Sequence, residues 1–306
     1  ISPASRQHAQ HDEKPAPHII SVFNSQQLDY AQSMNYRHAY HAGNFADCMK
    51  HALLVSLLSH FLRKPAPFMM LDTHAGLGRY DLLSTEAEKT QEWHSGIGLL
   101  ADEPHDSPLT PWLEQVKKTR NPHVYPGSPL LISYLLREQD RLICCEKHPD
   151  DKRKLYGVFA RNPAVAVHER DGYEALRALL PPKDIKRGLV LIDPPFEELN
   201  EFARLAQAVS TIQARFPAAI IAIWYPIKHR TPVRNFMTGL QDAGVRDILT
   251  AELLMKPATD PDQLNGSGLM VIKPPYGFAE QASQQLARLK TVFHAFSAEV
   301  VQSVAQ

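Results

Sequence analysis

Short apolar runs that alternate with helical patterns constrain the fold of this chain more than any other feature of its sequence. Five of them occupy residues 68–71, 142–145, 164–167, 189–192 and 219–224. Buried strands separated by helices are typical of a mostly parallel sheet that carries helices on both faces. Two further runs, 248–255 and 269–272, are joined by a turn-rich segment and predict an antiparallel final pair. We therefore expect an α/β fold with a mostly parallel, seven-stranded sheet.

The spacing of these runs also divides the chain. The gap between the first two runs is far longer than a crossover requires, and its part at about 80–126 contains Trp93, Trp112 and several prolines. We interpret this part as an inserted helical subdomain that packs. Residues 1–33 have little apolar periodicity, which predicts a loosely ordered extension before a main domain over 34–306. Apolar residues at helical spacing predict a helix that begins near Asp47.

Composition excludes several classes of protein. Lys plus Arg and Asp plus Glu each number 33, so this is no chain that holds nucleic acid by bulk charge, although a local basic face stays open. Cys48, Cys144 and Cys145 form no CxxC pair and no disulfide framework, which favours reduced thiols in a cytosolic protein. No apolar run reaches the roughly 18 residues of a membrane span, and the polar first residues show no signal peptide. We expect a cytoplasmic protein without a membrane partner.

The segment Gly188-Leu-Val-Leu-Ile-Asp-Pro-Pro-Phe196 points most directly to chemistry. An apolar strand stops at Asp193, and Pro194 and Pro195 then stiffen the chain and leave nearby carbonyls free to accept. The exocyclic amine of a base is a poor nucleophile, because its lone pair is delocalised into the ring. A carboxylate and a carbonyl that accept its N–H groups favour the nucleophilic form, and Phe196 can stack on the base. The motif predicts methyl transfer from S-adenosylmethionine to an adenine N6; a proline-rich turn is the alternative.

Acidic residues also end the strands that precede this motif. The first run leads into Asp72-Thr-His-Ala-Gly76-Leu-Gly78, whose glycines allow a ligand to approach the backbone, but the third glycine of a dinucleotide fingerprint is missing. Glu146 ends the second run and Asp171 follows the third. Because ligands lie at the carboxyl ends of such strands, we expect Glu146 to meet ribose hydroxyls and Asp171 an adenine amino group. Taken singly, each acid is also typical of a helix cap.

Histidines gather in the segment that precedes the first strand. His38, His41 and His51 lie close to Asp47 in the sequence, and Asp47 and His51 are one helical turn apart. A metal site is one interpretation, but neither HExxH nor a carboxylate-rich spacing accompanies these residues, so no metal is predicted. A contact to nucleic acid or to the cofactor and a packed helix start both stay open.

Basic residues are concentrated near the last strands. Five of them stand against the single acid Asp242, namely Arg215, Lys228, Arg230, Arg234 and Arg246. Such an excess is able to hold phosphates, and we expect it to form one positive face around the Asp193 pocket. A solvated basic helix face is the alternative.

From Met34 to about Pro275 the chain resembles the RlmJ family of bacterial 23S ribosomal RNA adenine-N6 methyltransferases. The resemblance rests on Tyr-Arg-His-Ala-Tyr-His-Ala-Gly-Asn, Leu-Asp-Thr-His-Ala-Gly, Tyr-Pro-Gly-Ser-Pro-Leu, Leu-Leu-Arg-Glu-Gln-Asp, Leu-Ile-Asp-Pro-Pro, Trp-Tyr-Pro and Gly-Ser-Gly-Leu-Met-Val-Ile, in this order. It implies a class I, Rossmann-like methyltransferase domain with a small helical insertion after the first strand. It also implies S-adenosylmethionine as methyl donor, with S-adenosylhomocysteine as the product.

The resemblance also implies roles for individual residues. Cofactor contacts are expected at His51, His74, Ser128, Glu146, Asp171, Gly172 and Asp193, to which the glycine turn adds Gly76. The catalytic group is expected to be Asp193, with Pro194, Pro195 and Phe196 beside it. Tyr36 and Arg37 are expected to touch the RNA. Phe196 stands where the family often has tyrosine, which keeps the stacking ring but lacks the hydroxyl.

We thus expect a monomer that methylates 23S ribosomal RNA, free or in an early particle, without an obligate protein partner. The target base must leave its stack, which favours single-stranded RNA. One alternative is the same reaction on DNA adenine. Another is a metal-dependent nuclease built on the N-terminal histidines, since the family is linked to the use of external DNA. An RNA-binding module without catalysis is a third.

Overall fold

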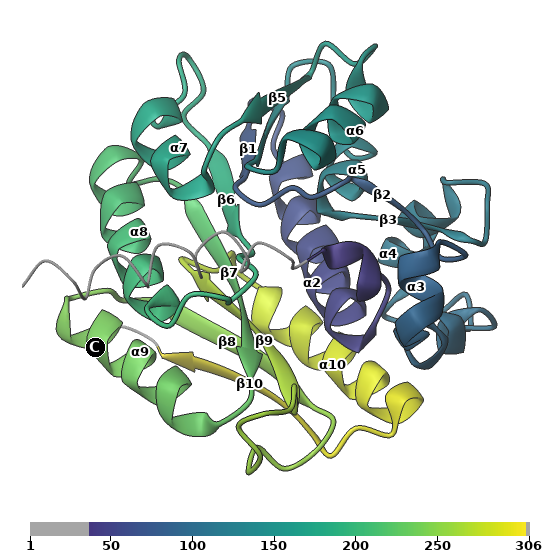
Figure 1. Ribbon diagram of the computed structural model, residues 1–306. Coiled ribbons are helices and arrows are strands. Elements are labelled where there is room, and N and C mark those ends of the chain that lie inside the picture. Colours follow the sequence, from purple (N-terminus) through teal and green to yellow (C-terminus); the bar gives the residue numbers. More distant parts are fainter. Residues whose placement is uncertain (1–36, 304–306) are drawn as a thin grey trace, which may run out of the picture. The chain divides into compact units, whose positions relative to one another are not determined.

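The computed structural model describes residues 37–303, and a central eight-stranded sheet runs through them (Figure 1). The strand order is β10-β8-β9-β7-β6-β1-β4-β5. The predicted parallel block is confirmed, because β5, β4, β1, β6 and β7 pair side by side in parallel. These strands are β1 (Met69–Asp72), β4 (Arg141–Glu146), β5 (Val165–Glu169), β6 (Gly188–Ile192) and β7 (Ile220–Ile227).

The antiparallel part of the sheet closes its other end. β8 (Ile248–Leu254) pairs antiparallel with β9 (Gly266–Ile272), as predicted, and β9 lies between β7 and β8. The expected count of seven strands was wrong, because β10 (Ser297–Ser303) pairs antiparallel with the outer side of β8. Its half-exposed, mostly polar residues carry little apolar signal. Main-chain hydrogen bonds to β8 hold this edge strand.

Helices cover both faces of the sheet, as predicted, because consecutive strand residues point to opposite sides. Met70 belongs to the core cluster on one face, whereas Met69 and Leu71 belong to the cluster on the other. The first face carries α2 (Phe45–Leu62), α4 (Thr110–Lys117), α5 (Ser128–Ser133), α6 (Pro149–Phe159) and α10 (Phe278–Phe293). The second face carries α7 (Gly172–Leu179), α8 (Glu201–Arg215) and α9 (Arg230–Asp242).

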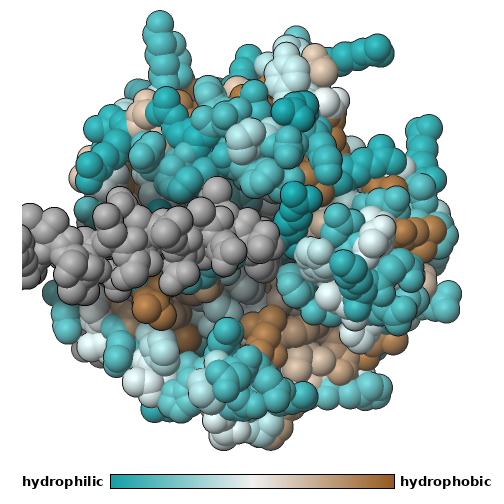
Figure 2. Space-filling model, in the orientation of Figure 1, coloured by the Kyte–Doolittle hydropathy of each residue, from teal (hydrophilic) through white to brown (hydrophobic). Residues whose placement is uncertain are grey.

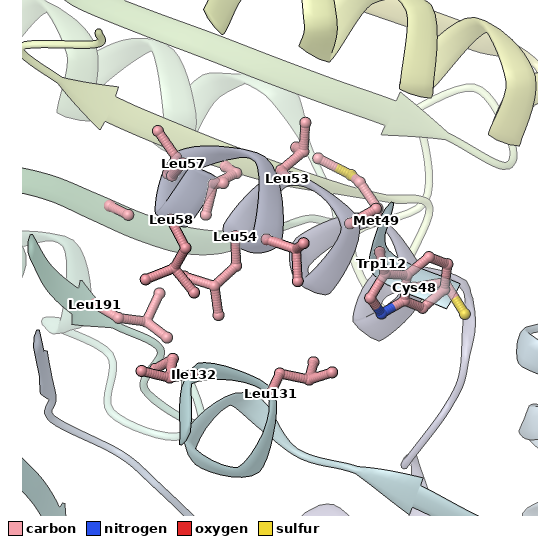
Figure 3. Close-up of a cluster of buried hydrophobic side chains, with 14 of the residues drawn as sticks. Cys48, Met49, Leu53, Leu54, Leu57, Leu58, Trp112, Leu131, Ile132 and Leu191 are labelled. Carbon is pink, nitrogen blue, oxygen red and sulfur yellow. The ribbon is translucent and has the colours of Figure 1, made fainter. Parts of the chain in front are cut away.

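Helix α2 is the most deeply buried of these elements. Its leucines pack against Leu191 of β6 and against Leu131 and Ile132 of α5 (Figure 3). A helix that is apolar on all sides has to lie inside the protein, and most residues of α2 are indeed buried, including Asp47, Lys50 and His51. Charged side chains in such a helix need partners, and those partners lie at the candidate site.

The segment between β1 and β4 contains several short elements. They are β2 (Arg79–Asp81), α3 (Thr85–Thr90), the 3-10 helices η2 (Glu92–Ser95) and η3 (Ile97–Leu100), α4, β3 (Val124–Pro126) and α5. β2 and β3 pair antiparallel, so the two ends of the stretch that the sequence sets apart at about 80–126 lie together. Trp112 of α4 is fully buried, which gives this stretch its own link to the core.

Hydrophilic side chains cover most of the face seen in Figure 2, with smaller hydrophobic patches between them. Within residues 37–303, none of the helices combines the length and the apolar character that crossing a membrane requires.

Candidate active site

The candidate site lies where the order of the parallel strands reverses. The chain passes from β1 to β4 and β5 on one side of β1 and then returns to β6 on its other side. Open α/β sheets bind ligands at the carboxyl ends of strands at such a point. The main-chain N–H and the side-chain hydroxyl of Thr73 both donate to the carbonyl of Leu191, at 3.1 and 2.9 Å. These bonds tie the turn after β1 to the end of β6, next to Asp193.

Asp193 binds a buried lysine from α2. Nζ of Lys50 lies 2.5 Å from Oδ2 of Asp193 and 2.9 Å from Oδ1 of Asp47. Lys50 is 3% exposed and Asp47 is 2% exposed, whereas the Asp193 side chain is 14% exposed. Within residues 37–303, the hydrogen bond to Asp193 goes to Oδ2, so Oδ1 is left with its acceptor capacity intact.

The charges of this triad stabilise one another. Burial works against the ammonium of Lys50, but Asp193 and Asp47 outweigh it and raise the pKa of Lys50. Burial likewise works against the carboxylate of Asp47, but His38 and Lys50 hold the pKa of Asp47 well below its ordinary value. Nε2 of His38 lies 2.9 Å from Oδ2 of Asp47. The site therefore contains a charged lysine clamped between two carboxylates.

Aromatic rings form a wall beside Lys50. The rings of Phe196 and Trp224 meet edge to face with their centroids 5.8 Å apart, and Phe196 meets Phe202 in the same way at 5.1 Å. Nζ of Lys50 lies 5.9 Å from the ring centre of Trp224. Nε1 of Trp224 donates to Oγ of Ser267 at 2.8 Å, which fixes the indole ring. Such rings offer a planar base a stacking surface.

The backbone of the Asp-Pro-Pro-Phe segment is sharply bent. Pro194 is buried and Pro195 is exposed, and Phe196 then adopts a left-handed φ of +52°. For a residue with a Cβ, the left-handed conformation is less favourable by roughly 1–2 kcal/mol. Strained conformations of this kind collect at functional sites. Here the bend turns the Phe196 ring back towards Trp224.

The glycine turn after β1 holds the carboxylate that ends β4. The N–H of Gly76 donates to Oε2 of Glu146 at 2.9 Å, and the N–H of His148 donates to Oε1 at 2.8 Å. Gly76 has φ +59°, and a Cβ there would lie 2.2 Å from Oη of Tyr80. Burial raises the pKa of Glu146. Each carboxylate oxygen retains a second lone pair for a further donor, such as a ribose hydroxyl.

Asp72 and Ser128 form a buried pair between these two ends of the site. Oγ of Ser128, at the start of α5, donates to Oδ2 of Asp72 at 2.6 Å. Both residues are buried. Burial raises the pKa of Asp72 to about 7, although the bond from Ser128 works in the other direction.

Asp171 caps a helix, which is the alternative that the sequence left open. Its Oδ1 accepts from the N–H groups of Tyr173 and Glu174 at the start of α7, and its Oδ2 lies 3.3 Å from Nζ of Lys147. A Cβ on Gly172 would lie 2.2 Å from the carbonyl oxygen of Thr73, so α7 approaches the β1 turn closely. This contact brings α7 to the same edge as Gly76 and Asp193.

The two predicted cofactor histidines lie in different surroundings. His74 is half-buried in the β1 turn, accompanied by Oγ1 of Thr73 at 2.8 Å and the ring of Tyr173. His51 is 1% exposed, and its Nδ1 lies 2.7 Å from Oη of Tyr125. Burial lowers the pKa of His51 to about 3, which makes it a neutral residue of the packed layer between α2 and β3.

Of the two residues expected to touch RNA, Arg37 falls at the start of the described chain. Arg37 is exposed and precedes η1 (His38–Tyr40). Tyr36 lies outside the described residues, as does the predicted extension over 1–33.

The N-terminal histidines have separate partners. His38 binds Asp47, His41 binds Glu92, and His51 binds Tyr125. Among residues 37–303, no three His, Cys, Asp or Glu side chains come together in a group suited to a metal ion. The arrangement on which the nuclease interpretation depended is therefore not formed by these side chains.

The expected single basic face was wrong. Lys228, Arg230 and Arg234 follow β7 at its carboxyl end, on the side of Asp193. Arg215 precedes β7 and Arg246 precedes β8, which runs in the same direction, so both lie at the opposite edge. There they bind main-chain carbonyls, of Leu180 and of Gln241 respectively. Arg230 binds Glu252.

Sequence reasoning missed Lys50 and did not assign Trp224. Lys50 stands one turn after Asp47 in an otherwise apolar, buried helix, and a charge in that position requires a partner. Trp224 belongs to a motif that the sequence singled out, but only the fold shows that its ring faces Phe196 and Lys50. The structure thus brings Asp193, Lys50 and the aromatic wall together beside the Gly76–Glu146 turn.

Known proteins resemble this chain over most of its length. The family model described as "Ribosomal RNA large subunit methyltransferase D, RlmJ" matches residues 65–301. Two curated proteins named "Ribosomal RNA large subunit methyltransferase J", from Haemophilus influenzae and Escherichia coli, are each 38% identical to this chain. The matches cover 84% and 83% of this chain and 92% and 91% of the two relatives, respectively. The crystal structure of a Legionella pneumophila protein has a TM-score of 0.77 and 32% identity, and covers 87% of this chain and 98% of its own.

Proposed function

The chain belongs to the RlmJ family of ribosomal RNA large subunit methyltransferases, and from this premise we propose that it methylates the exocyclic N6 of an adenine in 23S ribosomal RNA. Its fold is that of the class I S-adenosylmethionine-dependent methyltransferases, with one additional edge strand. The choice of adenine N6 is supported by one observation above all. Asp193 directly follows β6; one of its carboxylate oxygens is bound by Lys50, whose ammonium also lies by the ring of Trp224, and Trp224 in turn meets Phe196.

This geometry supports a specific role for each group. Oδ1 of Asp193 and a carbonyl of the following prolines accept the N–H groups of the adenine amine, which concentrates the lone pair on N6. Lys50 holds the carboxylate in one orientation through Oδ2, since its ammonium lies 2.5 Å away. Orientation of this kind lowers the barrier by prepaying the entropy of alignment. The proton that N6 gives up passes to the Asp193 carboxylate, the base within reach.

The residues around the β1 turn fit an adenosine-type cofactor. Gly76 lacks the Cβ that would collide with Tyr80, and Glu146 is fixed by two main-chain donors with lone pairs to spare. Glu146, Gly76 and His74 would hold the nucleoside, with Asp171 and Gly172 beside them and Ser128 behind Asp72. His51, buried between α2 and β3, would support the cofactor site from within the core. When bound, S-adenosylmethionine supplies an electrophilic methyl group on a sulfonium. We assign no metal to this reaction.

The substrate has to present an unstacked base. The Asp193 side chain is only 14% exposed, so an adenine within a duplex is out of its reach and has to be flipped or single-stranded. Lys228 and Arg234, both exposed after β7, are suited to phosphates nearby. Tyr36 and Arg37 keep the RNA contacts that the family resemblance implies. We place the reaction in the cytoplasm, on free 23S RNA or an early particle, by a monomer without an obligate protein partner.

The test is transfer of labelled methyl groups to unmodified 23S RNA, followed by nucleoside analysis. We expect N6-methyladenosine, loss of transfer in Asp193→Asn by on the order of a hundredfold or more, and retention of cofactor affinity in that variant. Asp242→Asn, at the far end of α9, is the matched control and should remain active. Label on another atom, or full activity in Asp193→Asn, would sink the proposal. If DNA were methylated in preference to RNA when the two polymers compete, DNA would be the substrate instead of RNA.

A further inference from the structure

The segment inserted between β1 and β4 contacts the start of α2 through its main chain. The N–H of Ile97 donates to the carbonyl of Gly43 at 2.8 Å. A Cβ on Gly96 would lie 2.1 Å from that same carbonyl oxygen, so only glycine allows the two backbones to approach this closely. Gly43 itself has φ +77° and immediately precedes Asn44, the N-cap of α2. The insertion is therefore fitted against the first turn of the helix that carries Lys50.

Glu92, at the beginning of η2 in this insertion, binds residues at the start of α2 with its side chain. Its Oε1 lies 2.9 Å from Nδ1 of His41, and its Oε2 accepts from Nδ2 of Asn44 at 2.9 Å. Burial works against the carboxylate of Glu92, but the bonds from His41 and Asn44 outweigh it and lower the pKa of Glu92. Glu92 is thus an anion held by two groups of the N-terminal segment.

Continuous hydrogen bonds lead from Asn44 to the site. Oδ1 of Asn44 accepts from the N–H of Asp47 at 3.0 Å, and Oδ2 of Asp47 accepts from the N–H of Gly43 at 3.0 Å. Oδ1 of Asp47 then binds Nζ of Lys50 at 2.9 Å, and Nζ reaches Asp193 at 2.5 Å. Asn44 therefore fixes the first turn of α2 and, through that turn, the position of the Asp47 carboxylate that binds Lys50.

We infer that Glu92 is a positioning residue for methyl transfer, through which the insertion fixes Asn44, Asp47 and Lys50 relative to Asp193. This inference rests on the proposed function, because it assumes that the Asp193 carboxylate acts on the substrate. Three residues, Asn44, Asp47 and Lys50, connect Glu92 to Asp193, so Glu92 acts on Asp193 only through them. Loss of the Glu92 side chain should therefore misplace Lys50 and Asp193 without removing either of them.

The experiment compares Glu92→Ala and Glu92→Gln with Glu88→Ala, which removes an exposed carboxylate from α3 of the same insertion. Because displacement of a reacting group by a fraction of an ångström is costly, we expect Glu92→Ala to lower kcat for RNA about tenfold. KM for RNA and the affinity for S-adenosylhomocysteine should change by less than about twofold, since a positioning residue affects the chemical step and not the binding of either ligand. Glu92→Gln should recover most of kcat, because its amide oxygen still accepts from Asn44. Glu88→Ala should match the wild type.

A double-mutant cycle and an exchange measurement separate positioning from a general loss of structure. Asn44→Ala and the double variant with Glu92→Ala should have the same kcat, since Glu92 acts through Asn44. Losses that multiply, or a Glu92→Ala variant as active as Glu88→Ala, would overturn the inference. Amide hydrogen exchange over residues 43–51 should be faster in Glu92→Ala and unchanged over β6. Unchanged exchange over 43–51 would also overturn it, and this readout stands even if the wild type does not methylate RNA.

Discussion

Nζ of Lys50 lies 2.5 Å from Oδ2 of Asp193, although 143 positions separate the two residues in the chain. The contact joins a helix on one face of the sheet to the carboxyl end of a central strand. The buried ammonium of Lys50 is neutralised by Asp193 as well as by Asp47. The same contact orients the Asp193 carboxylate for the substrate. The stability of the fold and the geometry of the reaction thus depend on the same ion pair.

Lys50→Met should destabilise the protein. Methionine fills the space of the lysine stem but leaves Asp47 and Asp193 without their shared cation, and breaking a buried pair in this way costs on the order of 3 kcal/mol. We expect the free energy of unfolding in urea at pH 7 to fall by about this amount. Asp47→Asn combined with Lys50→Met should recover part of the loss, because the double variant buries one carboxylate fewer after the lysine is gone. Lys117→Met, on the exposed side of α4, is the control; equal stability of both single variants would contradict the prediction.

Trp224→Ala should impair turnover of RNA while sparing the cofactor. The indole ring, fixed by Ser267, faces Phe196 and Lys50, where the target base has to lie. Loss of a stacking surface costs roughly 1–3 kcal/mol per base, so kcat/KM should fall about tenfold to a hundredfold. Trp224→Phe keeps an aromatic surface and should lose less. The affinity for S-adenosylhomocysteine, measured by calorimetry, should stay the same in both; a parallel loss of cofactor binding would show that the ring serves the cofactor pocket instead.

Gly76→Ala should lose both stability and cofactor affinity. Alanine at φ +59° costs about 1–2 kcal/mol by itself, and its Cβ would lie 2.2 Å from Oη of Tyr80. Tyr80→Phe removes the colliding oxygen, along with its bond from the N–H of Leu77. Gly76→Ala should therefore cost less free energy of unfolding in the Tyr80→Phe background than in the wild type. Purely additive costs would indicate that the backbone strain alone is responsible.

Asp72 should make the stability depend on pH. Burial raises its pKa to about 7 in the folded protein, above the ordinary value of 3.8. Between these two values the folded state keeps a proton that the unfolded state has released, so this contribution to stability is complete below about pH 4 and is lost as the pH rises through about 7. Asp72→Asn carries no such proton. Its free energy of unfolding relative to the wild type should therefore improve from pH 5 to pH 8, and parallel pH profiles would contradict the assignment.

Local patterns of the sequence were sufficient for most of the sheet. The apolar runs predicted all five parallel strands and the antiparallel final pair, because a strand buried on both faces is apolar at every position. The residues that follow β1, β4, β5 and β6 were likewise predicted to share one edge, since parallel strands end on the same side. β10 was missed because an edge strand of polar residues is held by main-chain hydrogen bonds, which leave no mark on the side chains.

By itself, the sequence determined the fold class, the Asp-Pro-Pro-Phe exit from β6 and the acids at the strand ends, because periodicity and strand termini are properties of neighbouring residues. Only the tertiary structure decided that Lys50 meets Asp193, that Trp224 faces Phe196, and that the basic stretch divides between two edges of the sheet. These relationships depend on how α2 packs over β6 and on which way each strand runs. A buried charge shows that a partner is required, but the packing of distant elements selects which residue that partner is.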